Sequence, residues 1–110
     1  MKLPNSDRAI IDERKLRDYV LSTEHPIGRF KAAYFRNHGF TAENWESLRD
    51  QLLSLVRGAD AELGERSRFG QEYLVSGILR ADTGQTLKVQ SVWIILEGDD
   101  NPRLVTVYPR

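Results

Sequence analysis

The segment from His25 to Lys31 brings an imidazole, a guanidinium and an ammonium group close together in the chain. A histidine can take up or release a proton near neutral pH. Lys31 can offset the negative charge that develops on a phosphorane, and Arg29 can bind a phosphate. We therefore predict that His25 and Lys31 are catalytic and that Arg29 binds substrate. A loop histidine bonded to backbone, with solvated basic neighbours, is the structural alternative.

The backbone of this segment is constrained by Pro26 and Gly28. The residue before a proline disfavours the helical region, so His25 is expected in a connection between two helices. The exposed N–H groups and the dipole at the start of the second helix favour a phosphate. The other histidine, His38, precedes Gly39 at a predicted helix C-terminus, where we expect it to cap the helix.

A second group of polar side chains lies near the C-terminus. Strand alternation puts Val105 and Val107 on one face. It puts Leu104, Thr106 and Tyr108 on the other face. If the valines face the helices, the two hydroxyl groups reach an open face, where they can bond a phosphate or orient a ribose 2′-OH. Threonine and tyrosine are also good strand formers, which is the structural alternative.

Ser91 lies on the neighbouring predicted strand and is a candidate for substrate binding, although the sequence does not fix its face. The chain contains no HExxH, P-loop, GxSxG or paired-cysteine pattern. The common signatures of metal sites, phosphate loops and serine hydrolases are therefore missing. We expect no metal and no cofactor.

Three helices are predicted in the first half of the chain, over residues 12–21, 28–37 and 41–58. Asp12 and Thr41 are suitable N-cap residues, and Gly39 is suitable for ending the second helix. The first helix has an apolar face made of Leu16, Tyr19 and Val20. The third helix has the clearest apolar stripe, made of Trp45, Leu48, Leu52, Leu55 and Val56.

After residue 58 the hydrophobic pattern changes to the alternation of strands. Strands are predicted over residues 59–63, 72–81, 86–97 and 103–108, with a loop at 65–70 and turns at 82–85 and 98–102. Gly84 can take the positive φ of a hairpin turn. The predicted fold class is α+β, with three N-terminal helices packed on one face of a three- to four-stranded antiparallel β-meander. The other face would be partly open to solvent.

The chain has 110 residues, with 16 Lys and Arg against 16 Asp and Glu. This length predicts one domain over residues 1–110. A neutral chain is not a general polyanion binder, although residues 1–36 hold eight basic residues against five acidic ones. The lack of cysteines, of a signal peptide and of a long apolar run predicts a cytoplasmic protein with no membrane partner.

The sequence resembles a family of small uncharacterised bacterial proteins through segments spread over nearly its whole length. These segments are Leu3-Pro4-Asn5-Ser6, His25-Pro26-x-Gly28-x-x-Lys31-Ala32, Val89-x-Ser91-Val92-Trp93 and Pro102-Arg103-Leu104-Val105-Thr106-x-Tyr108-Pro109. Members of that family tend to be encoded beside another small protein. The resemblance therefore implies a toxin–antitoxin pair, with a small antitoxin protein as partner.

The final segment Thr106-x-Tyr108-Pro109, which follows helices and a meander, resembles the barnase/EndoU/colicin/RelE group of ribonucleases. Those toxins use a site on the sheet without a metal, built from His, Lys or Arg, Thr or Ser, and Tyr. Carried over by position, the implied set is His25, Lys31, Ser91, Arg103, Thr106 and Tyr108. In this set Arg103 joins Ser91 as a substrate-binding residue. The neutral charge of this chain departs from the basic character of such toxins.

The leading hypothesis is a metal-independent RNA endonuclease that acts as the toxin of a bacterial pair. The alternative is a noncatalytic protein-interaction module that uses the open sheet face. An enzyme requires His25 or Lys31 within reach of Thr106 and Tyr108. A docking module predicts a large apolar patch at that place instead.

Overall fold

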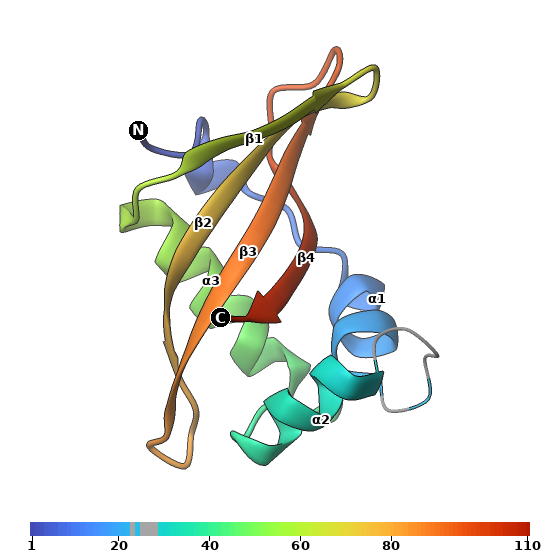
Figure 1. Cartoon of the computed structure of the whole chain (residues 1–110), viewed down its shortest axis with the longest axis vertical. Coiled ribbons are helices and arrows are strands. Elements are labelled where there is room, and N and C mark those ends of the chain that lie inside the picture. Colours follow the sequence, from blue (N-terminus) through green and yellow to red (C-terminus); the bar gives the residue numbers. More distant parts are fainter. Residues whose placement is uncertain (23, 25–28) are drawn as a thin grey trace.

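The computed structural model describes residues 1–22, 24 and 29–110, with the backbone alone at residues 29 and 30. This part of the chain folds into an α+β structure whose four-stranded antiparallel sheet has the order β1-β2-β3-β4 (Figure 1). The strands are β1 (Glu62–Ser67), β2 (Gly70–Arg80), β3 (Thr86–Leu96) and β4 (Arg103–Pro109). The helical elements are η1 (Ser6–Arg8), α1 (Glu13–Lys15), η2 (Leu16–Val20), α2 (Arg29–Asn37) and α3 (Trp45–Gly58). Within the described residues, no helix combines the length and the apolar character needed to cross a bilayer.

The first helix changes its hydrogen bonding after one turn. Asp12 caps α1 as predicted, because its carboxylate accepts a hydrogen bond from the N–H of Arg14 at 2.9 Å. In η2 the N–H of Leu21 donates to the carbonyl of Leu16 at 2.8 Å, which closes a π-helical turn. Single π turns are frequent at functional sites, and this one carries Tyr19.

The helix α3 begins at Trp45, later than the start predicted at Thr41. The side-chain oxygen of Asn44 accepts a hydrogen bond from the N–H of Thr41 at 2.7 Å, and the hydroxyl of Thr41 accepts one from the N–H of Asn44 at 3.3 Å. These reciprocal bonds hold the chain in a turn before the helix. The predicted apolar stripe is confirmed: Leu48, Leu52 and Val56 are fully buried, and Trp45 and Leu55 pack against the same core.

The strands at residues 72–81, 86–97 and 103–108 are confirmed to within two residues at each end. The first predicted strand is present at the edge of the sheet, but its bounds were wrong, because β1 starts later than residue 59 and includes part of the segment expected to be a loop. The side chains of β1 are mostly exposed, so no apolar alternation marks this edge strand. Gly84 has a φ of 90° in the turn between β2 and β3, as predicted.

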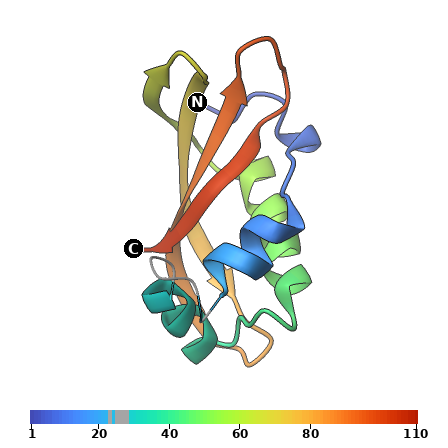
Figure 2. The same ribbon diagram turned by 90° about the vertical axis from the view of Figure 1, so that its right-hand side faces the viewer.

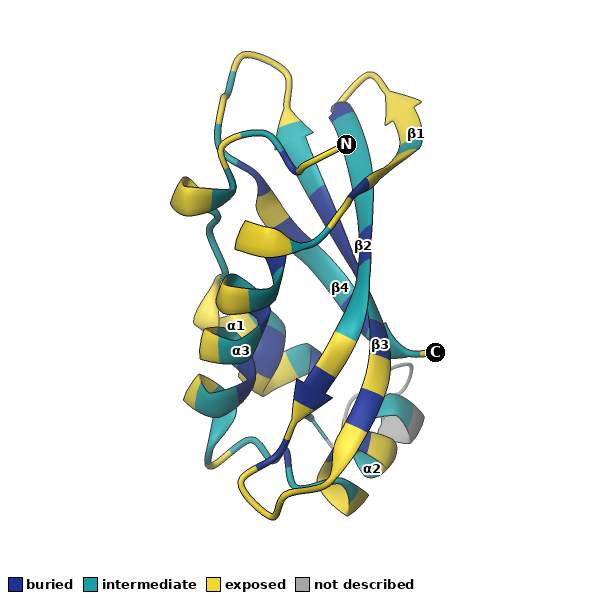
Figure 3. Ribbon diagram, turned by 90° about the vertical axis from the view of Figure 1, so that its left-hand side faces the viewer, coloured by how far each residue is buried: buried dark blue, intermediate teal, exposed yellow. Residues whose placement is uncertain are grey.

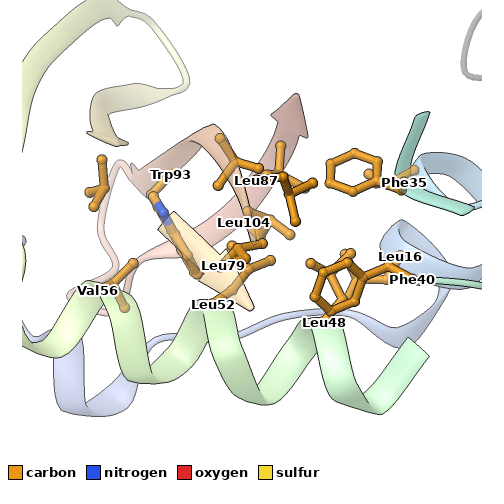
Figure 4. Close-up of a cluster of buried hydrophobic side chains, with 14 of the residues drawn as sticks. Leu16, Phe35, Phe40, Leu48, Leu52, Val56, Leu79, Leu87, Trp93 and Leu104 are labelled. Carbon is orange, nitrogen blue, oxygen red and sulfur yellow. The ribbon is translucent and has the colours of Figure 1, made fainter. Parts of the chain in front are cut away.

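A hydrophobic core fills the space between α3 and the sheet (Figure 4). The fully buried side chains on the sheet side are Val75, Val89, Trp93 and Val107. Figures 2 and 3 show α1 and α3 on one side of the sheet, with α2 beyond the C-terminal end of β4. The prediction that all three helices pack on one face is therefore not confirmed.

One irregularity in β4 changes which side chains share a face. The pairing of β3 with β4 shifts between Val92 and Trp93, which leaves Val105 as an extra residue on β4. Leu104 consequently pairs with Trp93 and is buried on the core face. The prediction that Leu104 shares a face with Thr106 was wrong, because simple alternation takes no account of such a bulge.

Candidate functional site

The sheet face opposite the core, which we call the open face, presents side chains in rows across β2, β3 and β4. The pairing register gives one row of Leu74, Val92 and Thr106, a second row of Ser76, Gln90 and Tyr108, and a third that begins with Ile78 and Lys88. Alternate residues of a strand point to the same side, so these rows lie on one surface. Polar groups from three strands therefore gather near the C-terminal end of β4.

Lys31 and Thr106 meet on this side of the sheet although they are 75 residues apart in the chain. The ammonium group of Lys31 donates a hydrogen bond to the hydroxyl oxygen of Thr106 at 3.1 Å. The helix α2 lies beside the end of β4 (Figure 1), and Phe35, one turn after Lys31, is fully buried in the core. The fold thus brings a cation from α2 to a hydroxyl group on β4.

The side chain of Tyr19 covers the same ammonium group. The Lys31 nitrogen lies 5.2 Å from the centroid of the Tyr19 ring. Partial burial lowers the pKa of Lys31, because the charged form loses contact with water. The cation–π contact with Tyr19 favours the charged form and would raise the pKa. Because the pKa is lowered, the effect of burial is larger than that of this contact.

A chain of hydrogen bonds runs across the second row of the open face. The side-chain amide of Gln90 donates to the hydroxyl oxygen of Tyr108 at 2.6 Å. The hydroxyl of Ser76 donates to the amide oxygen of Gln90 at 3.4 Å. Because the Tyr108 oxygen accepts from Gln90, its own proton can be donated to a ligand. Tyr108 stands two residues after Thr106 on the same face, at a separation of about 7 Å along the strand.

The remaining predicted site residues lie elsewhere or outside the described part of the chain. His25 and the side chain of Arg29 lie outside the described residues. Arg103 stands at the first position of β4, three residues before Thr106, and its side chain is paired with Asp99 at 3.5 Å. The structure therefore brings Lys31 and Thr106 into contact with Tyr108 nearby, and places Arg103 at the other end of β4.

Ser91 does not belong to the open face. It is in register with Val107, and its side chain is fully buried on the core side of the sheet. Its hydroxyl donates to the carbonyl of Val75 at 2.8 Å and accepts from the indole N–H of Trp93 at 2.8 Å. The sheet separates it from Thr106, so we correct its predicted role from substrate binding to core stabilisation.

Replacing Ser91 by alanine is expected to lower the free energy of unfolding by about 1–3 kcal/mol, because it leaves a buried indole N–H without its acceptor. Chemical denaturation measures this loss. In a protein that already carries Trp93→Phe, the same Ser91→Ala change should cost less, since no N–H remains to be satisfied. Equal losses in the two backgrounds would contradict the proposed partnership of Ser91 with Trp93.

Two residues of the site are not among the sequence-based candidates. Tyr19 fits an apolar helical stripe by its spacing, and nothing local shows that its ring covers a lysine. Gln90 alternates with buried neighbours on β3, which is a usable signal for an outward-facing residue. Its partners Ser76 and Tyr108 follow only from the register of three strands.

The described residues contain no group of three or more His, Asp or Glu side chains placed to hold a metal ion. His38 has the capping role expected of it, since its ring nitrogen Nδ1 lies 2.8 Å from the carbonyl oxygen of Tyr34. The groups gathered on the open face are an ammonium, two hydroxyls and a carboxamide. Such groups bind and stabilise an oxyanion and transfer protons.

Fold and site together define a small α+β protein that carries a cation–hydroxyl site on an open antiparallel sheet. Residues 2–110 match the family described as a domain of unknown function, DUF6883, and the chain belongs to this family. This agrees with the resemblance to an uncharacterised family found in the sequence.

None of the curated proteins matches the chain. Among solved structures, one chain of a contact-dependent growth inhibition toxin–immunity protein complex from Klebsiella pneumoniae 342 has a similar fold, with a TM-score of 0.69. The two sequences are 10% identical, and the alignment covers 96% of each chain. At this level of identity the likeness concerns the fold alone.

Proposed function

We propose that this protein is a metal-independent RNA endonuclease and the toxin of a pair in which a second protein neutralises it. The observation that carries the proposal is the contact between Lys31 and Thr106 on the same sheet face as Tyr108. An ammonium group of lowered pKa, a hydroxyl and a phenol are suited to a phosphate ester whose charge increases during reaction.

The proposed reaction is an in-line attack of a ribose 2′-oxygen on the adjacent phosphorus. His25, assigned from the sequence, removes the 2′-OH proton, the new P–O2′ bond forms and the P–O5′ bond breaks. Tyr108 donates a proton to the departing 5′-oxygen. Lys31 and Thr106 bind the phosphate oxygens and stabilise the added negative charge of the phosphorane. The products are a 2′,3′-cyclic phosphate and a 5′-hydroxyl.

Cleavage of cellular RNA by the purified protein is expected to persist in EDTA and to fall by at least about 100-fold in the His25→Ala variant, since a general base contributes at least this factor. Gel analysis of RNA fragments and detection of the cyclic phosphate measure both effects. The control is His38→Ala, whose ring contacts a helix carbonyl and should be dispensable for cleavage. RNA left intact at high protein concentration would refute the ribonuclease activity.

The similarity to a chain of a toxin–immunity complex supports a role in a two-protein system. We propose that the partner is the small protein encoded beside this one. Expression in bacteria should arrest growth, and co-expression of the neighbouring protein should relieve the arrest. Growth that is unaffected by the chain alone would argue against the toxin assignment.

A noncatalytic interaction module is the second candidate, and the exposure of Ile78 favours it. This side chain is 63% exposed on the open face, beside the polar rows. An interaction module should bind its partner through Ile78 and leave RNA intact. If Ile78→Asp abolishes partner binding while wild-type protein spares all RNA, the second candidate is preferred.

A further inference from the structure

A second group of polar side chains lies at the C-terminal end of the open face, next to the proposed catalytic groups. It surrounds an open hollow of about 550 Å³ lined by Ser76, Gly77, Ile78, Lys88, Val89 and Arg110. The guanidinium of Arg110 donates a hydrogen bond to the hydroxyl of Ser76. The same Ser76 hydroxyl contacts Gln90, which bonds Tyr108. The hollow is therefore connected to the candidate site through a continuous polar chain.

The two cations of this hollow stand opposite each other on neighbouring strands. The N–H of Arg110 donates to the carbonyl of Lys88 at 2.9 Å, which continues the β3–β4 register beyond the Val89–Pro109 pair. Like charges directly opposite each other destabilise a sheet. No ion pair involves Lys88 or Arg110 among the residues that the structure describes. An anion placed between the two cations would remove this repulsion.

The segments that form this end of the open face contain cations and no acidic residue. Residues 74–80, 86–92 and 106–110 include Arg80, Lys88 and Arg110 but neither Asp nor Glu. The helix α2 beside them also contains basic residues and no acidic ones. Two carboxylates flank these segments: Glu72 lies on β2 four residues before Ser76, and Asp82 lies in the turn after β2. A protein of zero net charge thus has a locally positive face, and such a face attracts anions.

We propose that Lys88, Arg110 and Ser76 form a second phosphate-binding subsite, which holds a backbone phosphate of the RNA strand next to the one cleaved. This inference rests on the proposed ribonuclease function. Arg110 follows Tyr108 by two residues and Thr106 by four on the same face, so a strand of RNA that runs along β4 meets Lys31 first and this subsite next. Guanidinium groups bind phosphate through paired hydrogen bonds. The exposed side chain of Ile78 beside Lys88 offers an apolar surface to the intervening ribose or base.

The test measures binding of a short single-stranded RNA that cannot be cleaved because its 2′-hydroxyls are methylated. Fluorescence anisotropy gives the dissociation constant between 50 and 200 mM salt for wild type and for Lys88→Gln/Arg110→Gln. Each phosphate contact to a single strand contributes about 0.7 to the slope of log affinity against log salt. The slope of the double variant should therefore be smaller by about 1.4. Between 50 and 200 mM salt, the RNA affinity of wild type should fall by a factor about seven times larger than the factor for the variant.

The matched control is Arg8→Gln/Arg57→Gln, which removes the same charge from exposed positions on η1 and α3. Its salt slope should equal that of wild type. A slope that is unchanged in the Lys88/Arg110 variant, or that changes equally in the control, would overturn the subsite. Circular dichroism of each variant verifies that the fold is retained, and single Lys88→Gln and Arg110→Gln variants should each show half of the effect.

A cleavage assay separates failure of the subsite from failure of the proposed function. The Lys88→Gln/Arg110→Gln variant should cleave a dinucleotide at the wild-type rate, since this substrate has one phosphate, and should cleave longer RNA more slowly. Equal cleavage of both substrates by variant and wild type would overturn the subsite and leave the ribonuclease standing. RNA binding with the predicted slopes but no cleavage would refute the ribonuclease and retain the phosphate site.

Discussion

Replacing Lys31 by methionine is expected to reduce RNA cleavage by at least about 100-fold without unfolding the protein. The ammonium group is the only described cation in contact with Thr106, and methionine cannot donate a hydrogen bond or carry charge. Methionine retains an apolar stem that can lie against the Tyr19 ring. Single-turnover cleavage rates measure the loss, and thermal unfolding verifies the fold.

Lys15 provides a control of the same residue type. Its ammonium group lies 5.6 Å from the centroid of the same Tyr19 ring, but no hydrogen bond joins it to Thr106. Lys15→Met should therefore cleave RNA at close to the wild-type rate. Equal losses in the two variants would indicate that net charge, rather than the contact with Thr106, explains the effect of Lys31.

The lowered pKa of Lys31 predicts that the stability difference between Lys31→Met and wild type depends on pH. The unfolded chain keeps the Lys31 proton to higher pH than the folded chain does. Between the two pKa values the unfolded state binds more protons, so this group makes the folded state relatively more stable as the pH rises. Below both values, the full cost of burying the charge is present.

Lys31→Met removes that cost and should be at least as stable as wild type at neutral pH. The difference in the free energy of unfolding between this variant and wild type should become smaller toward pH 10, near the ordinary pKa of lysine (about 10.4). Urea denaturation of both proteins at the two pH values measures the difference. A variant that is less stable at neutral pH would mean that the bond to Thr106 and the contact with Tyr19 outweigh the cost of burial.

Replacing Trp93 by alanine is expected to lower the free energy of unfolding by about 3–5 kcal/mol. Trp93 is fully buried in the cluster shown in Figure 4, and it is the largest of the fully buried side chains. The change leaves a large cavity beside α3 and removes the indole that bonds Ser91. Because small domains are stable by only about 5–15 kcal/mol, a substantial shift of the denaturation midpoint should follow.

The other tryptophan, Trp45, is the control for the loss of an aromatic ring. It is only partly buried and its ring lies under the guanidinium of Arg49, 4.9 Å from the centroid. Trp45→Ala should therefore cost less than Trp93→Ala. If Trp93→Ala does not yield folded protein, Trp93→Phe still tests the burial of Trp93. Its free energy of unfolding should be lower than that of wild type, by less than the loss expected for Trp93→Ala. A loss for Trp45→Ala as large as that for Trp93→Ala would contradict the placement of the core.

Local sequence is sufficient for most of the secondary structure, because the controlling interactions are close in the chain. Asp12 caps the N–H of Arg14 two residues away, and Gly84 takes a φ that a hairpin turn requires. The stripe of α3 follows from helical periodicity. The start of α3 was misplaced because reciprocal bonds between Thr41 and Asn44 hold residues 41–44 in a turn before the helix. The strand β1 was misplaced because an exposed edge strand has no apolar alternation to identify it.

The sequence by itself determined the residue types of the candidate site, Lys31 with Thr106 and Tyr108, since their chemistry is independent of the fold. Tertiary structure alone decided which of them meet. The bulge at Val105 sets the face of each residue of β4, and the π turn of η2 brings Tyr19 to Lys31. The register of β3 turns Ser91 into the core and aligns Gln90 with Tyr108. Strand pairing and side-chain burial bring together residues that lie far apart in the chain. A local sequence pattern cannot predict which of these distant residues come into contact.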